Sequence, residues 1–113
     1  MESDVGAVDH MWLAGLDDAP GILVKTGRAY LFNWDIDNTT AADAHIQLFD
    51  AAALADVTLG TTVPDYVIHS TSNANVTQAL SKPISFVLGL CVFSTTTSTG
   101  NTAAIQDVSL GFV

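Results

Sequence analysis

The segment 30–37 constrains the fold most, because apolar and polar side chains alternate along it. Successive side chains of a strand point to opposite faces of a sheet, so a period of two predicts a strand with one face in a core. We expect the buried face to carry Tyr30, Phe32, Trp34 and Ile36, and the opposite face to carry Leu31, Asn33, Asp35 and Asp37. The chain is therefore expected to be built around β-strands.

Other segments have a strand-like composition and are separated by turn residues. Several short strands spaced in this way are typical of an all-β sandwich or barrel. We predict an antiparallel β-sandwich, jelly-roll-like, of about seven or eight strands. The strand 84–93 is expected to meet the strand 30–36 in the core. The other strands are expected over residues 21–25, 45–49, 65–70, 76–80 and 105–113, with a loop containing one helical turn at most over 50–64, where Asp50 could cap the turn.

The first twenty residues differ from the rest and are predicted to form an N-terminal arm, residues 1–20, beside a β-sandwich domain, residues 21–113. Val5, Val8, Trp12 and Leu16 are spaced as on one face of a helix, but two glycines weaken a helix, and an extended arm is an equal alternative. Because a terminal arm has little else to pack on, we expect it to contact a partner. The residues expected to do so are Val8, Met11, Trp12, Leu13 and Leu16.

Composition limits the classes of partner. The chain has 113 residues, of which 49% are hydrophobic and 13% charged, whereas globular domains average about 25% charged residues. Twelve acidic residues face only three basic ones, Lys25, Arg28 and Lys82, for a net charge of −9. Nucleic acids and anionic membranes are bound largely through Lys and Arg, so both are excluded as partners. The low charge density indicates a surface that partners cover or that uncharged polar residues form.

Segments that would send the chain to or across a membrane are not expected. The start, Met-Glu-Ser-Asp, lacks the basic and apolar regions of a signal peptide. The longest apolar run, residues 84–93, is far shorter than the roughly 20 residues of a membrane span. The single cysteine, Cys91, excludes an intrachain disulfide and is expected to be buried in a strand.

Motifs of catalysis and metal binding are missing from the sequence. The run Asp35-x-Asp37-Asn38 resembles the start of a calcium loop, but the glycine and final glutamate of that loop do not follow. We therefore expect Asp35 and Asp37 to be outward-facing polar residues at a strand end. We predict no enzyme, no metal and no cofactor.

Two further sets of residues have weaker signals. The three histidines, His10, His45 and His69, are too dispersed for a metal motif, although they could converge in space. Asn38 and Asn75 each begin an N-glycosylation pattern and are expected in exposed loops.

The order of turn and strand motifs from residue 27 to 113 resembles a β-sandwich family of small structural proteins of tailed bacteriophages. The resemblance covers about three quarters of the chain. The first 26 residues lie outside it, and residues 70–82 lack the glycines that the family has there. The motifs are Gly-x-Ala-Tyr-x-Phe at 27–32, Asn-Thr-Thr-Ala-Ala at 38–42, Leu-Phe-Asp at 48–50, Thr-Leu-Gly-Thr-Thr-Val-Pro at 58–64, Gly-Leu-Cys-Val-Phe-Ser-Thr-Thr at 89–96, Thr-Gly-Asn-Thr-Ala-Ala at 99–104 and Asp-Val at 107–108.

This resemblance implies a virion component: a capsid decoration (cement) protein, or a head fibre or knob. Such a protein would be made in the host cytoplasm and would lie on the outer capsid surface, bridging subunits of the major capsid protein. Quasi-three-fold positions of a capsid favour a homotrimer. The family has no catalytic residues to transfer. The alternative is a glycan-binding module of a tail fibre or host-attachment protein, which needs exposed aromatic residues.

Overall fold

The computed structural model describes residues 21–113 and, as backbone, residues 9–16. The described chain is all-β, with one three-residue 3-10 helix, so no helix in these ranges could span a membrane. The elements are β1 (Asp9–Leu16), β2 (Ile22–Thr26), β3 (Ala29–Asn38), β4 (Ala44–Asp50), η1 (Leu54–Asp56), β5 (Tyr66–Ser70), β6 (Ala74–Phe86), β7 (Gly89–Thr95) and β8 (Gln106–Phe112).

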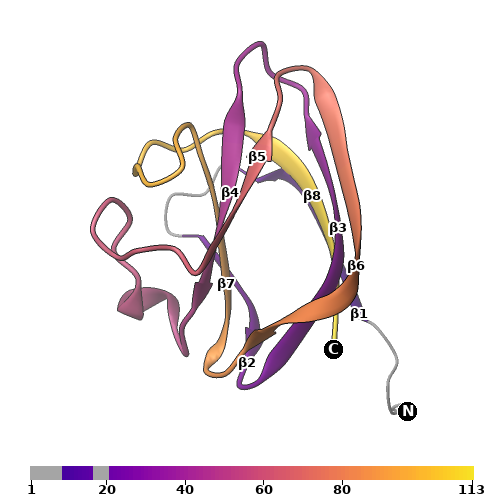
Figure 1. The fold of residues 1–113 in the computed structure, drawn as a ribbon. Helices are drawn as coiled ribbons and strands as arrows, with labels where there is room; N and C mark the ends of the chain where they lie inside the picture. The colour runs from indigo at the N-terminus through magenta and orange to yellow at the C-terminus, as the bar shows by residue number, and fades with distance from the viewer. Residues whose placement is uncertain (1–8, 17–20) are drawn as a thin grey trace.

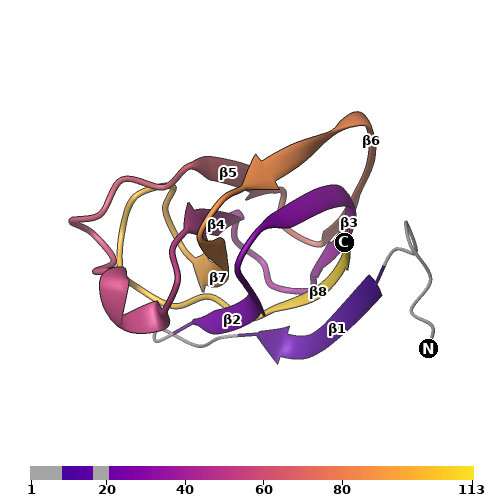
Figure 2. The ribbon, with the colours of Figure 1, turned by 90° about the horizontal axis from the view of Figure 1, so that it is seen from below.

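The strands form two antiparallel sheets that face each other (Figures 1 and 2). The first sheet has the order β1-β8-β3-β6, and the second has the order β2-β7-β4-β5. The pairs β1·β8, β2·β7, β3·β6 and β4·β5 are nested, since each joins strands equally far from the middle of the series. The chain therefore resembles one long hairpin that is folded over into two layers.

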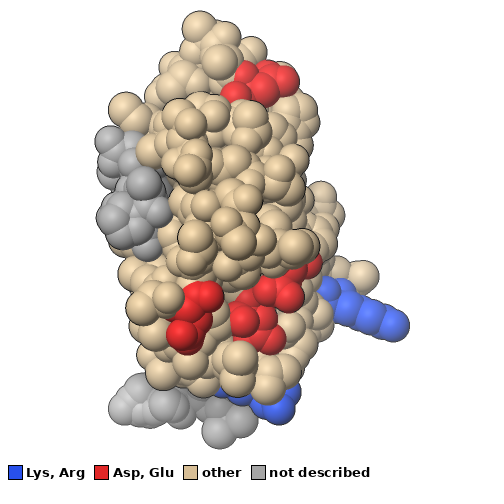
Figure 3. Space-filling view, turned by 90° about the vertical axis from the view of Figure 1, so that its left-hand side faces the viewer, with Lys and Arg blue, Asp and Glu red and all other residues tan. Residues whose placement is uncertain are grey.

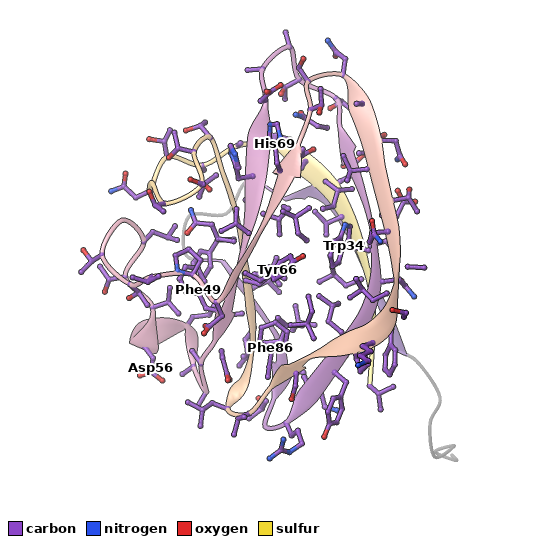
Figure 4. The ribbon with its side chains drawn as sticks, in the orientation of Figure 1. Trp34, Phe49, Asp56, Tyr66, His69 and Phe86 are labelled. Carbon is purple, nitrogen blue, oxygen red and sulfur yellow. The ribbon has the colours of Figure 1, made fainter. Side chains whose placement is uncertain are left out.

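The main core lies between the two sheets. Trp34 is buried in it, as the sequence predicts, and the Phe86 ring also lies between the sheets (Figure 4). The segments 30–36 and 84–93 were expected to meet, and they do: Ala29 and Leu31 of β3 pair with Phe86 and Ile84 of β6. The buried members of this core are Ala29, Leu31, Trp34, Ile36, Ile46, Leu48, Ile68, Phe86, Leu90, Val92, Val108, Leu110 and Phe112.

The alternation predicted for residues 30–37 is wrong in its first half. The register of β3 shifts between Leu31 and Asn33 against both β6 and β8. An extra residue in a strand reverses the side-chain order beyond it. Leu31 is therefore buried with Trp34 and Ile36, whereas Tyr30 and Phe32 are only half-buried.

The strand predicted over residues 84–93 is in fact a hairpin. Its first part ends β6 at Phe86, the chain turns at Val87 and Leu88, and β7 starts at Gly89. The strand predicted over 76–80 belongs to the same β6, which has 13 residues. The strands predicted near residues 21–25, 45–49, 65–70 and 105–113 are confirmed to within two residues at their ends.

A second apolar cluster covers the outer face of the β2-β7-β4-β5 sheet. Phe49 and Phe93 meet edge to face, with ring centroids 5.4 Å apart. Leu54, Val57 and Leu59 from the 51–64 loop pack against them, so this loop forms a lid on the sheet (Figure 4). Cys91 is buried in this cluster, and burial, with lesser contributions from Asp56 and Asp50, raises the pKa of its thiol. A thiol in this state is a poor nucleophile.

Of the two alternatives for the N-terminal segment, the helix is wrong for residues 9–16, which form β1. This strand pairs antiparallel with β8, with Met11 opposite Leu110 and Trp12 opposite Ser109. The extended alternative agrees with this pairing. The division of residues 1–20 from residues 21–113 as a separate arm stays a prediction.

Candidate partner-binding surfaces

The turn between β6 and β7 presents two apolar side chains to solvent. Val87 and Leu88 are 54% and 55% exposed. The turn that they form lies at the lower end of the molecule in Figure 1. Exposed apolar side chains that are adjacent and rigidly held are candidates for contact with a partner. We call Val87 and Leu88 the apolar tip.

The carboxylate of Asp50, at the end of β4, holds the apolar tip. It accepts hydrogen bonds from the backbone N–H groups of Val87 at 2.9 Å, Leu88 at 2.7 Å and Gly89 at 3.3 Å. The turn is fastened on its other side by Gly27, whose N–H donates to the Leu88 carbonyl oxygen at 2.9 Å. The tip is thus fixed by β4 and by the turn between β2 and β3, and little ordering would be needed when a partner binds.

The charge state of Asp50 follows from these contacts. Burial raises the pKa of the carboxyl, but the N–H groups of Val87, Leu88 and Gly89 and the nearby Arg28 outweigh burial and leave the pKa below its usual value. The role predicted for Asp50 as a helix cap is wrong, because Ala53 precedes η1 and makes no side-chain cap bond. Asp50 secures a turn that lies 37 residues further along the chain.

Replacing Asp50 with asparagine should lower the free energy of unfolding at neutral pH by about 2 kcal/mol, because charged acceptors contribute roughly 1.5–3 kcal/mol per bond when buried and less when partly exposed. Because the folded pKa is lowered, the stabilisation by Asp50 is present above the unfolded pKa of about 4 and is lost as pH falls through the folded pKa. Urea unfolding of wild type and D50N at neutral pH and near pH 3 checks this. A difference between the two proteins that stays the same at both pH values would contradict it.

The opposite end of the molecule has a small polar cluster between β4 and β5. His45 and His69 are directly opposite each other, with stacked rings 5.0 Å apart, and His69 Nε2 lies 3.1 Å from Asp43 Oδ2. Asp43 also accepts the Ser72 N–H at 2.9 Å, and this bond and then His69 lower the pKa of its carboxyl. The cluster fastens the 71–73 turn to the 39–43 turn.

The sequence left open whether His10, His45 and His69 converge in space, and the structure brings two of them together. His45 and His69 meet, while the side chain of His10 lies outside the described residues. Within the described part of the chain, no three His, Cys, Asp or Glu side chains are placed so that they could hold a metal ion.

The Asp35-x-Asp37-Asn38 run lies at the end of β3. Asp35 accepts a hydrogen bond from the Thr77 hydroxyl at 3.1 Å, and Asp37 lies opposite Asp107 of β8. Asn38 is fully buried, so its predicted place in an exposed loop is wrong. Its side-chain amide donates to the carbonyl oxygens of Ala42 and Ser70, and its oxygen accepts from Thr40, so it organises the 39–42 turn.

Asn75, the second asparagine of a glycosylation pattern, is exposed as expected but lies within β6 and not in a loop.

Four of the five residues predicted to contact a partner are on β1. Met11, Trp12, Leu13 and Leu16 are opposite Leu110, Ser109, Val108 and Gln106 of β8, which places them on an edge strand. Val8 lies outside the described residues, and the side chains of the other four do too. Their contact role stays a prediction.

Sequence reasoning missed Tyr66 and the apolar tip as surface features. Tyr66, at the start of the edge strand β5, is 40% exposed, and its ring lies 5.9 Å from the buried ring of Trp34 (Figure 4). Figure 3 shows a face on which uncharged atoms predominate and acidic side chains form small separate groups. This surface suits contact with proteins better than contact with a charged polymer.

Comparison of the chain with protein-family models, curated proteins and solved structures finds no match.

Proposed function

We propose that this chain is a virion structural protein: a decoration protein that binds the outer surface of a tailed-phage head and bridges neighbouring major capsid subunits. The observation that carries the proposal is the order of the strands. Two sheets with the orders β1-β8-β3-β6 and β2-β7-β4-β5 support a jelly-roll sandwich, in which two Greek keys are wound together. Viral capsid proteins and lectins both use this architecture. The phage-like order of turns in the sequence favours the virion.

The absence of a catalytic constellation among the described residues is compatible with a protein whose work is assembly. The buried Cys91 has a raised pKa, and the acidic residues Asp43 and Asp50 are committed to backbone N–H groups. We propose that the chain is not an enzyme and needs no cofactor.

The contacts with the capsid would come from the apolar tip and from β1. Val87 and Leu88 are held rigidly, which lowers the entropic cost of binding. Each contact is small, but a protein that meets several capsid subunits, or binds as a trimer, gains affinity through multivalency.

The proposal is tested with heads of the phage whose genome encodes the chain, prepared with and without it. The purified protein should bind stripped heads at a fixed ratio to the major capsid protein and should raise the temperature at which they release DNA. The single variants V87D and L88D should each bind far more weakly. Ile105 is 50% exposed and lies before β8, away from the tip, so I105D is the matched control and should bind as wild type does. Binding of wild type only to tails, or unchanged head stability on binding, would contradict the proposal.

A second function, a glycan-binding module for host attachment, is favoured by one observation. Tyr66 is 40% exposed, and Tyr30 and Phe32, which were expected in the core, are only half-buried. Exposed aromatic rings can stack on sugars. Labelling of whole virions separates the two proposals, because an attachment module would be found at the tail tip and a decoration protein over the head.

A further inference from the structure

Strand β6 is the longest strand of the described chain and lies at the border of its sheet. It has 13 residues and pairs with β3 along one side, with an irregularity between Ala79 and Ile84. On its other side, no strand of the described chain is hydrogen-bonded to it. Figure 2 shows β6 at one border of the sheet and β1 at the other. The outer side of β6 is therefore a row of backbone groups available to another strand.

The first part of β6 lacks the devices that normally prevent pairing between molecules. Residues 74–81 contain no charge and no proline, and both Lys82 and Pro83 come after them. Natural edge strands are usually short, charged or interrupted by proline. Two other edges fit that rule: β2 has five residues and contains Lys25, and β5 has five residues and contains His69, which is bonded to Asp43. The remaining described edge, β1, has eight residues and begins with the charged Asp9.

We propose that residues 75–81 of β6 pair antiparallel with the same residues of a second copy of this chain, across a two-fold axis at Gln78. The two β1-β8-β3-β6 sheets would then form one continuous sheet of eight strands. Because the axis is perpendicular to the sheet, the outward faces of both copies stay on the same side. The inference goes beyond the proposed function and does not depend on it.

The positions of the acidic groups in the sheet permit β6 of one copy to pair with β6 of another. The chain has a net charge of −9, so two copies repel each other unless their acidic groups stay apart. The acidic residues nearest to β6 in its sheet are Asp35 and Asp37 on β3. Across the paired strands, Asp35 of one copy lies three strand spacings, about 14 Å, from Asp35 of the other, which exceeds the Debye length of about 8 Å at physiological salt. Pairing should therefore strengthen as salt is raised from low concentration.

The test is sedimentation equilibrium of the full chain with variants at Gln78. This side chain is exposed, and its only described side-chain bond is to the neighbouring Ala79 carbonyl oxygen, so its replacement should leave the fold intact. Wild type should be in monomer–dimer equilibrium. Q78K and Q78E should each raise the dimer dissociation constant about tenfold or more, since like charges would meet across the axis.

Thr99 provides matched controls, because it is exposed in the 96–104 loop, which lies on the other side of the molecule from β6 in Figure 1. T99K and T99E change the net charge by the same amounts as Q78K and Q78E, and they should dimerise much as wild type does. Q78K lowers the net negative charge, so weaker dimerisation of Q78K than of T99K cannot come from general repulsion. Circular dichroism and thermal unfolding confirm that each variant is folded.

Three results would overturn the inference. One is a wild-type chain that stays monomeric at all accessible concentrations in about 0.3 M salt, where the Debye length is about 6 Å. Another is a dimer whose affinity changes equally in the Gln78 and Thr99 variants. The third is hydrogen exchange of residues 75–81 that does not slow as the protein concentration rises.

Discussion

Replacing Gly89 with alanine should lower the free energy of unfolding by about 3 kcal/mol, the upper range for overpacking a tight site. A Cβ atom on Gly89 would lie 2.5 Å from the Ala51 carbonyl oxygen and 2.8 Å from the Lys25 carbonyl oxygen. Both are backbone atoms, so neither can move aside as a flexible side chain would. Gly89 also starts β7 and donates its N–H to Asp50, so the apolar tip should shift as well. Urea unfolding measures the loss.

Gly27 is the matched control, because it also has a positive φ, of 80°, but no atom lies within 4 Å of a Cβ placed there. G27A should cost only the backbone strain, about 1 kcal/mol. Equal losses in G89A and G27A would mean that strain, and not the two carbonyl contacts, sets the requirement for glycine at position 89.

Replacing Phe49 with alanine should lower the free energy of unfolding by about 3–4 kcal/mol, as for other buried phenylalanines. Phe49 is 1% exposed although it lies on the outer face of its sheet, because Phe93 and the 51–64 loop cover it. Removing the ring leaves this loop without its main apolar support. Hydrogen exchange in residues 51–64 should therefore rise more than the global loss of stability explains.

Phe86 is the comparison for this variant, because it is equally buried but lies in the core between the sheets. F86A should lose similar stability, while exchange in the 51–64 loop should follow global unfolding alone. If F49A and F86A had the same pattern of exchange, the outer cluster would not be a separate packing unit.

The all-β class and most strand positions could be predicted from the sequence because they depend on local composition. The errors arose where long-range pairing decides the outcome. The bulge in β3 reverses which of Leu31 and Phe32 is buried, and only the partners β6 and β8 reveal it. Similarly, residues 84–93 are apolar throughout both arms of a hairpin, so hydrophobicity could not locate the turn. Gly89 was the one local signal that could have done so.

The candidate surface was harder to predict than the fold. Val87 and Leu88 look like core residues, because the run around them is apolar, and their exposure depends on Asp50 binding the turn from β4. Nothing in the local sequence relates residue 50 to residues 87–89. Tyr66 was likewise placed at the surface by the edge position of β5 in its sheet.

The nested strand pairing has a consequence for how this protein is made. The innermost pair, β4 with β5, joins neighbours in the chain, whereas the outermost pair joins β1 to β8, with Asp9 opposite Phe112. Pairing of distant segments is slow, because the intervening chain must first be ordered. On a ribosome, β1 would emerge first and wait for its partner until β8 has been synthesised. During that interval β8, which lies between β1 and β3 in the finished sheet, is absent. The edges of β1 and β3 that will pair with β8 therefore stay unpaired for the longest time in the nascent chain.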